Sequence, residues 1–272
     1  MHPFLKTVRE TETPWGTAAL WWLSQMGLLI KLGDALLCID YYASRSPGRQ
    51  TLPPVPAEEV SGIDLFLGTH DHSDHIDHPS WQIWAKQCPK ARFVFPVAHR
   101  DAVLGDGIHP ENCVGMNAGQ TRKIGQVTVH ALAAAHEFLD KDVNTGLYPC
   151  LQYIVEGNGV RLYHAGDTLR YEGMLPALQR FGFIDAALLP INGRDGERYR
   201  RNCIGNMTFQ EAADLAGELC PCTVIPGHWD LFADNRGDPE AFRDYLSAKY
   251  GNEIACCLPK LAEPIMIRAR QV

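Results

Sequence analysis

The stretch that most constrains this chain is residues 68–77, GTHDHSDHID. Three histidines and three aspartates fall between positions 70 and 77. The stretch follows the apolar run 63–67, IDLFL, and precedes a predicted helix that opens at Pro79 and Ser80. It is therefore predicted to be a loop at the carboxyl end of a strand, where α/β proteins tend to place their sites.

The spacing within this loop predicts a metal centre. In an extended loop, residues i and i+2 face the same way, so His70 and His72 can reach one metal ion. Asp74 and His75 follow where the chain turns towards the helix, and they would face a neighbouring point suited to a second ion. Imidazole with carboxylate is the ligand set of zinc, manganese or iron in hydrolytic sites. One loop cannot close two coordination shells, so other loops must contribute.

Three further ligand candidates have the required setting, because each one follows a predicted strand. They are His136, Asp167 and His228. His164, just before the Ala165–Thr168 turn, could be either a site residue or a structural histidine. Asp71 and Asp77 are expected to orient the loop or to accept hydrogen bonds from ligand histidines.

Short apolar runs bounded by Gly, Asp or Pro predict ten strands, and five segments predict helices. The predicted strands are 19–24, 27–32, 35–40, 64–68, 92–95, 127–132, 151–156, 160–164, 186–190 and 223–225. The predicted helices are 79–87, 98–105, 172–181, 208–219 and 238–249. Thr208 and Glu211 form a capping-box pattern at the start of the fourth helix. Hairpins come first and βα units follow, which indicates a layered α/β fold with helices on the outer faces of sheets. No linker divides residues 1–272, so a single domain is predicted.

Composition narrows the class of protein further. A formal net charge of −7 gives the chain no overall attraction for nucleic acid or an anionic membrane. The most apolar run, residues 15–39, is interrupted by Gln25, Lys31 and Asp34 and is predicted to form strands joined by a hairpin. The first residues lack the apolar core of a signal peptide, and the nine cysteines have no regular spacing. A cytoplasmic protein with reduced thiols is expected.

These motifs resemble those of the metallo-β-lactamase superfamily. The run from His70 to His75 matches its H-x-H-x-D-H signature, and His136, the Gly166–Thr168 turn and the Pro226–His228 segment match its later motifs in the right order. The resemblance covers most of the chain, from Trp21 to about residue 250. It implies a four-layer αβ/βα sandwich, with two facing sheets and a dinuclear site at one edge.

The resemblance also implies a role for each ligand candidate. One ion would be held by His70, His72 and His136. The second would be held by Asp74, His75 and His228, and Asp167 would bridge the two. Di-iron members that reduce oxygen carry Glu at the position of His72, which disfavours that branch. Two divalent ions are expected, manganese or zinc, with iron also compatible.

Within the superfamily, the chain looks most like lactonases of the L-ascorbate 6-phosphate type. Residues 21–44, 51–60 and 188–212 carry this closer match. It implies a hydrolase in which a metal-bound hydroxide attacks a small anionic substrate, such as a sugar-phosphate lactone, with Asp74 orienting the hydroxide and moving a proton. A homo-oligomer is also implied. The alternative is a phosphodiesterase acting on a small, cyclic phosphodiester, because two ions also suit attack at phosphorus.

Substrate recognition is predicted in residues 192–202, NGRDGERYRRN. Four arginines fall within eight residues, and guanidinium groups bind phosphate through paired N–H donors. The same segment could equally be a solvated loop in which the arginines pair with Asp195 and Glu197. Its two asparagines could bind substrate or stabilise turns. The candidates are Asn192, Arg194, Arg198, Arg200, Arg201 and Asn202.

Overall fold

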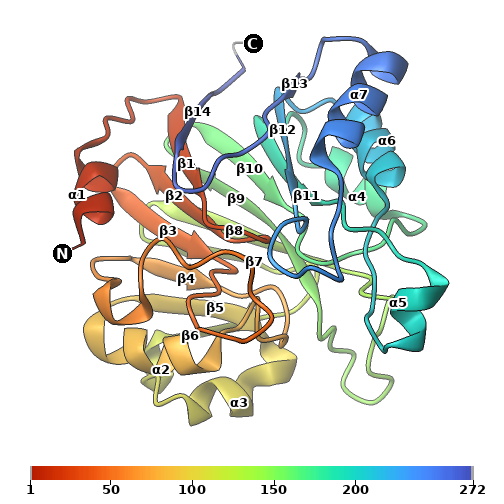
Figure 1. Cartoon of the computed structure of the whole chain (residues 1–272). Coiled ribbons are helices and arrows are strands. Elements are labelled where there is room, and N and C mark those ends of the chain that lie inside the picture. The colour runs from red at the N-terminus through yellow and green to blue at the C-terminus, as the bar shows by residue number, and fades with distance from the viewer. Residues whose placement is uncertain (1, 271–272) are drawn as a thin grey trace.

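The apolar runs of the sequence pair into two facing sheets. The computed structural model describes residues 2–270, and within them fourteen strands form two sheets of seven, with helices outside (Figure 1). The first sheet has the order β14 (Pro264–Arg268), β1 (Thr17–Trp22), β2 (Leu28–Leu32), β3 (Ala35–Ile39), β4 (Leu65–Leu67), β5 (Arg92–Pro96), β6 (Cys113–Met116). The second has the order β13 (Ala255–Cys256), β12 (Thr223–Gly227), β11 (Ala186–Pro190), β10 (Val160–His164), β9 (Leu151–Gly157), β8 (Val127–Ala133), β7 (Thr121–Ile124).

Both sheets change strand direction in the same way. In the first, β14, β1, β2 and β3 are antiparallel, and β3 to β6 are parallel. In the second, β7 to β10 are antiparallel, and β10 to β13 are parallel. Each sheet therefore joins an antiparallel part to a part with parallel strands and crossover connections.

The run of residues 15–39 is apolar because its strands are buried on both faces. Leu20 and Trp22 point into the core between the sheets, whereas Ala19 and Trp21 point to the outer face. Strands covered on both sides have continuous rather than alternating apolar sequences. The predicted hairpin is present between β2 and β3, where Leu32 pairs with Ala35. Among residues 2–270, no helix combines the length and apolar character needed to span a membrane.

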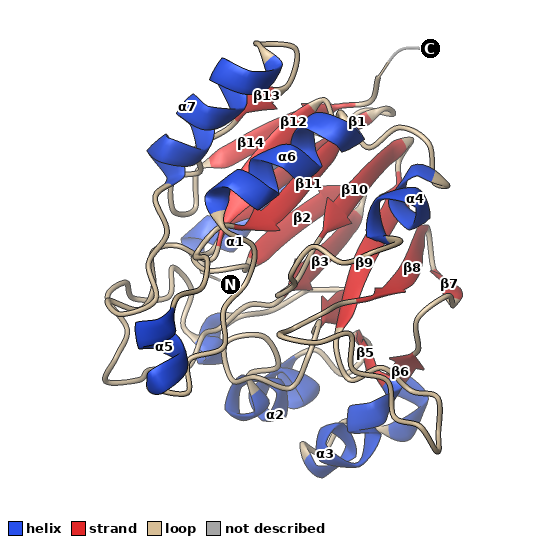
Figure 2. Cartoon of the chain, turned by 90° about the vertical axis from the view of Figure 1, so that its right-hand side faces the viewer, coloured by secondary structure: helices blue, strands red, loops and turns tan. Residues whose placement is uncertain are grey.

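Helices cover the outer face of each sheet. On the first sheet, α1, α2 and α3 contribute Val8, Trp84 and Val103 to the outer core. On the second, α4, α6 and α7 do the same, and they lie in front of its strands in Figure 2. The helices are α1 (Pro3–Glu10), α2 (His78–Gln87), α3 (Arg100–Gly105), α4 (Met174–Gln179), α5 (Gly196–Arg200), α6 (Phe209–Leu219) and α7 (Pro239–Tyr250).

This architecture confirms the predicted αβ/βα sandwich. All ten predicted strands are present, with ends that differ by a few residues. The predicted capping box is also present, since Thr208 Oγ1 accepts from Glu211 N at 3.2 Å and Glu211 Oε2 accepts from Thr208 N at 2.9 Å. The predicted helix 98–105 begins as a 3-10 turn, and helix 172–181 is shorter than expected. The sequence analysis missed α1, α5, β6, β7, β13 and β14.

Candidate metal centre

The ligand candidates gather because strand ends from both sheets meet at one edge of the sandwich. The loop of residues 68–77 follows β4 in the first sheet. His136, Asp167 and His228 follow β8, β10 and β12, three strands of the second sheet that run in the same direction. The structure thus brings together side chains from positions far apart in the sequence.

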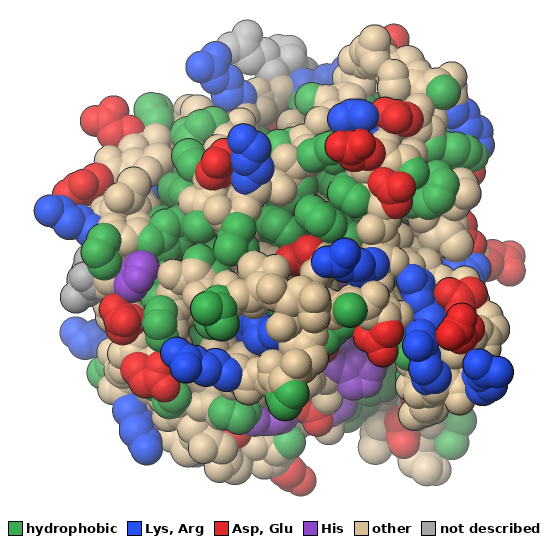
Figure 3. Space-filling model, in the orientation of Figure 1, with side chains coloured by type: hydrophobic (Ala, Val, Ile, Leu, Met, Phe, Trp, Pro, Cys, Tyr) green, Lys and Arg blue, Asp and Glu red, His purple; other side chains and the backbone are tan. Residues whose placement is uncertain are grey.

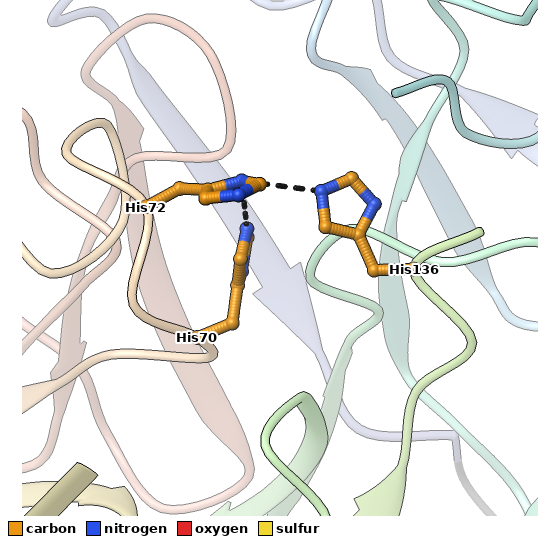
Figure 4. Close-up of side chains that lie close together, drawn as sticks. All are labelled: His70, His72 and His136. Atoms are coloured by element: carbon orange, nitrogen blue, oxygen red, sulfur yellow. Dashed lines mark hydrogen bonds between the residues drawn. The ribbon is translucent and has the colours of Figure 1, made fainter. Parts of the chain in front are cut away.

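The first trio of ligand atoms consists of three imidazole nitrogens. Nδ1 of His72 lies 3.0 Å from Nε2 of His70 and 3.2 Å from Nε2 of His136. Figure 4 shows the three nitrogens pointing towards one another, with the rings approaching edge to face. His70 is buried and His72 is exposed, so the trio is open to solvent on the His72 side. Imidazole surface reaches solvent in the lower right of Figure 3, beside charged side chains.

The second trio combines a carboxylate with two imidazoles. Oδ2 of Asp74 lies 3.7 Å from Nε2 of His75 and 3.7 Å from Nε2 of His228. Asp167 lies between the two trios. Its Oδ1 is 3.3 Å from Nε2 of His75, while its Oδ2 is 3.1 Å from Nε2 of His228 and 3.9 Å from Nε2 of His136.

A buried hydrogen-bond network orients two of these histidines. Oδ2 of Asp40 accepts from His75 Nδ1 at 2.7 Å and from Thr69 Oγ1 at 2.7 Å. Because the Thr69 hydroxyl donates its proton to Asp40, it is left as an acceptor for Nδ1 of His70 at 3.1 Å. Both rings therefore hold a proton on Nδ1, so Nε2 is the nitrogen that faces the centre and is available to a metal.

Burial keeps two of the imidazoles neutral. It lowers the pKa of His70 well below the ordinary value, and the neighbouring His75 and His136 act in the same direction. Burial also lowers the pKa of His136 to about 4. Neutral imidazole is the form that binds metal, so these two histidines are ready ligands at neutral pH.

The carboxylates remain ionised although they are buried. Burial alone would raise the pKa of Asp74 and Asp167, but the charges of His75 and His228 outweigh it and lower both pKa values. The same carboxylates raise the pKa of His75 and His228 against the effect of burial. The raised pKa values mean that the carboxylates favour a positive charge on His75 and His228. A metal cation bound by the second trio would replace the ring protons and meet the same two carboxylates.

The residues fit a pair of divalent ions. His75 Nε2 and Asp167 Oδ1 are buried and lie 3.3 Å apart, but neither makes a well-directed hydrogen bond with any group in residues 2–270. Buried polar atoms without such bonds are costly unless a cation meets them. The donor set of five imidazoles and two carboxylates suits zinc, manganese or iron.

Two other polar residues close to the ligand motifs, His164 and Asp77, have structural roles. His164 donates from Nε2 to Met26 O at 2.8 Å and accepts at Nδ1 from Gly166 N at 3.2 Å, so both its nitrogens are engaged. Asp77 accepts from the backbone of Ala43 and Ser44 and thereby anchors the ligand loop. His164 is thus a structural residue, and Asp77 has the orienting role expected of it.

The arginine-rich segment makes two of the expected ion pairs, Arg198 with Asp195 at 3.4 Å and Arg201 with Glu197 at 3.9 Å. Arg194 makes a bidentate ion pair with Glu211, at 2.6 and 2.7 Å. Arg198 donates to the carbonyls of Asn192 and Arg236. The remaining candidates differ in exposure: Asn192 is buried and bonded to Asn206 and Asn235, whereas Arg200, Arg201 and Asn202 are exposed.

Three residues of the centre were missed from the sequence. Thr69 and Asp40 set the histidine tautomers, and Gln25 donates from Nε2 to Oδ2 of Asp74 at 3.0 Å. Asp40 could have been found, because it directly follows the buried strand β3, as His136 and Asp167 follow their strands closely. Gln25 gave no such signal, since a lone glutamine in an apolar run is not specific.

Two facing sheets with a cluster of histidines and aspartates at one edge define the metallo-β-lactamase class of fold. Residues 38–229 match the family model described as "Beta-lactamase superfamily domain". The chain belongs to this family.

Relatives and solved structures agree with this membership. A protein of Pyrococcus furiosus named as a UPF0173 metal-dependent hydrolase is 30% identical over 80% of this chain and 87% of its own length. A Salmonella heidelberg protein named "Probable L-ascorbate-6-phosphate lactonase UlaG" is 26% identical over 87% of this chain and 76% of its own. The structure of Igni18, a metallo hydrolase from Ignicoccus hospitalis, is similar with a TM-score of 0.73 at 20% identity, covering 93% of this chain and 100% of the other.

Proposed function

We propose that this chain is a metal-dependent hydrolase that uses two divalent ions, manganese or zinc with iron also compatible, to cleave a small anionic substrate. The observation that carries the proposal is the position of Asp167, whose two oxygens approach His75 and His228 on one side and His136 on the other. A carboxylate between two complete ligand trios is the arrangement expected of a dinuclear centre.

The chain's own residues would position the reacting groups. Bound ions supply a nucleophile from water at neutral pH and a Lewis acid for the substrate oxygen. Asp74 is partly exposed, with 14% of its side chain accessible, so it can contact both the centre and an incoming substrate. Its ionised carboxylate would orient the attacking water and accept its proton. Asp40 and Thr69 would hold the imidazoles in place during this step.

A sugar-phosphate lactone such as L-ascorbate 6-phosphate is the substrate we favour. The similarity to the Salmonella relative supports it, and so does the likeness of residues 21–44 and 188–212 to lactonases of that type. Arg200 and Arg201 are exposed, and the contact of Arg201 with Glu197 is long at 3.9 Å, so these two are the better phosphate-binding candidates. Arg194 is already paired with Glu211, so its role would be to hold the loop.

The test is hydrolysis by metal-stripped protein reloaded with manganese or zinc. The substrates would be L-ascorbate 6-phosphate, simple lactones and an activated phosphodiester. Metal-dependent opening of the phosphorylated lactone that is lost in His72→Ala would support the proposal. A rise in KM for that lactone in Arg201→Ala, without a change for unphosphorylated lactones, would assign the phosphate contact.

Turnover of the phosphodiester alone would reject the lactonase assignment. The chain would then be a phosphodiesterase, since two ions also stabilise in-line attack at phosphorus. No turnover of any substrate by protein that holds two ions would exclude all of the substrate classes in the panel.

A further inference from the structure

Gln25 is fixed beside the second trio by its backbone. It lies in the turn between β1 and β2, and its side chain is buried with 1% exposed. Its carbonyl accepts from His228 N at 3.0 Å, and its own N–H donates to Asp230 Oδ1 at 2.9 Å. The residue adopts a positive φ of 52°, a conformation that these contacts maintain.

The amide of Gln25 touches two ligand atoms at once. Its Nε2 lies 3.0 Å from Oδ2 of Asp74 and 3.4 Å from Nε2 of His228. Other atoms of this site are separated by similar distances, such as the 3.1 Å between His228 Nε2 and Asp167 Oδ2. Bonds of about 2.1 Å to a common ion place its ligand atoms about 3.0–3.4 Å apart. The end of the Gln25 side chain therefore stands where a further ligand of the same ion would stand.

We propose that Gln25 is an additional ligand of the second ion, bound through its amide oxygen. This inference rests on the proposed dinuclear centre. Half a turn of the amide exchanges its oxygen and nitrogen without changing its shape. Without an ion, the NH₂ group is favoured because it donates to Asp74. A cation between Asp74 and His228 repels the NH₂ group and attracts the oxygen.

The surroundings of the amide permit this exchange. Oε1 of Gln25 is buried and has no hydrogen-bond partner among residues 2–270, so turning the amide breaks no bond on that side. The two contacts that the NH₂ group gives up, with Asp74 Oδ2 and His228 Nε2, are replaced by the contact of the amide oxygen with the ion. An amide oxygen is a hard, neutral donor, which favours manganese or magnesium relative to softer ions.

Metal binding, measured apart from activity, tests the proposal. Metal-stripped full-length protein would be titrated calorimetrically with MnCl₂, in a His72→Ala background that leaves only the second trio intact. Gln25→Met keeps the length and unbranched shape of the side chain but has no oxygen. Gln179→Met makes the same chemical change on the exposed end of α4 and serves as the matched control.

We expect Gln25→Met to weaken manganese binding by about tenfold or more, and Gln25→Glu to restore it. Gln179→Met should bind as its parent does. A crystal structure of the manganese-loaded protein should place the Gln25 oxygen on the second ion. Unchanged affinity in Gln25→Met, or an amide nitrogen still directed at Asp74 beside a bound ion, would overturn the inference. Failure of the unmutated protein to bind two ions would instead overturn the proposed function itself.

Discussion

Nδ1 of His75 donates a hydrogen bond to Oδ2 of Asp40 at 2.7 Å, and neither side chain has any exposed surface. Asp40 also accepts from the Thr69 hydroxyl and N–H, so one carboxylate holds the ligand loop at two points, Thr69 and His75. Removing the charge of Asp40 should therefore weaken metal binding although no metal-ligating residue is substituted.

Asp40→Asn is expected to lower metal affinity about 10–100-fold, because the amide cannot accept from both His75 and Thr69 as the carboxylate does. The measurement is calorimetric titration of metal-stripped protein. Asp185→Asn is the matched control, since Asp185 is a buried carboxylate that accepts from Arg161 N and Arg270 N before β11. Equal metal affinity in Asp40→Asn and the unmutated protein would refute the role given to Asp40.

His72→Ala should reduce the bound metal from two ions to one, because the first trio loses its central nitrogen. Metal content after dialysis, measured by plasma mass spectrometry, checks this. His109→Ala removes an imidazole that is exposed and outside the centre, and it should retain both ions. Two ions in His72→Ala would mean that His72 is not a ligand.

Removal of the ions should lower the melting temperature. At a free metal concentration of 100 times Kd, each bound ion contributes about 2.7 kcal/mol to folding stability. For a chain of this size, that corresponds to a decrease of roughly 5–10 °C for each ion that a chelator removes. Thermal unfolding followed by circular dichroism gives the difference. The decrease should be smaller in His72→Ala, and the same decrease in both proteins would contradict the prediction.

Glu211→Gln should destabilise the fold by about 1 kcal/mol at neutral pH, since it weakens both the cap of α6 and the pair with Arg194. The hydrogen bonds from Arg194 lower the pKa of Glu211. A carboxylate with a lowered pKa stabilises the folded state above its unfolded pKa, and this contribution is lost as the pH falls through the folded pKa. The difference from the unmutated protein should therefore shrink in acid.

Urea unfolding at several pH values measures this difference. Glu218→Gln is the control on the same helix, because Glu218 pairs with Arg170 at similar exposure but takes no part in the N-terminal cap, so it should contribute less. If both substitutions had the same effect at every pH, the cap and the bidentate pair with Arg194 would have no special role.

The sequence predicted most strands because burial on both faces makes them continuously apolar. β4 and β11 are buried along their whole length, and their apolar runs are unmistakable. β7 and β14 lie at sheet edges and expose most of their residues, so no apolar run marks them. Two-residue β13 is too short to carry any pattern.

In the metal centre, the residues that could be predicted are those marked by a local sequence pattern. The residues from His70 to His75 have a spacing that predicts, from the geometry of an extended loop, which side chains face the same way. The later candidates each follow a strand. The contacts of Gln25 and Arg194 depend on residues 49 and 17 positions away, at Asp74 and Glu211. Nothing local in the sequence reveals that Arg194 is engaged by a helix cap while Gln25 reaches the ligands.

The two sheets contribute unequally to the edge where they meet. The first sheet supplies four of the seven ligand candidates, through the loop from His70 to His75 that follows β4, and the second sheet supplies His136, Asp167 and His228. Neither sheet holds either of the two proposed ligand trios by itself. Ions bound there would link the two sheets, so loss of metal would also loosen the register in which the sheets face each other.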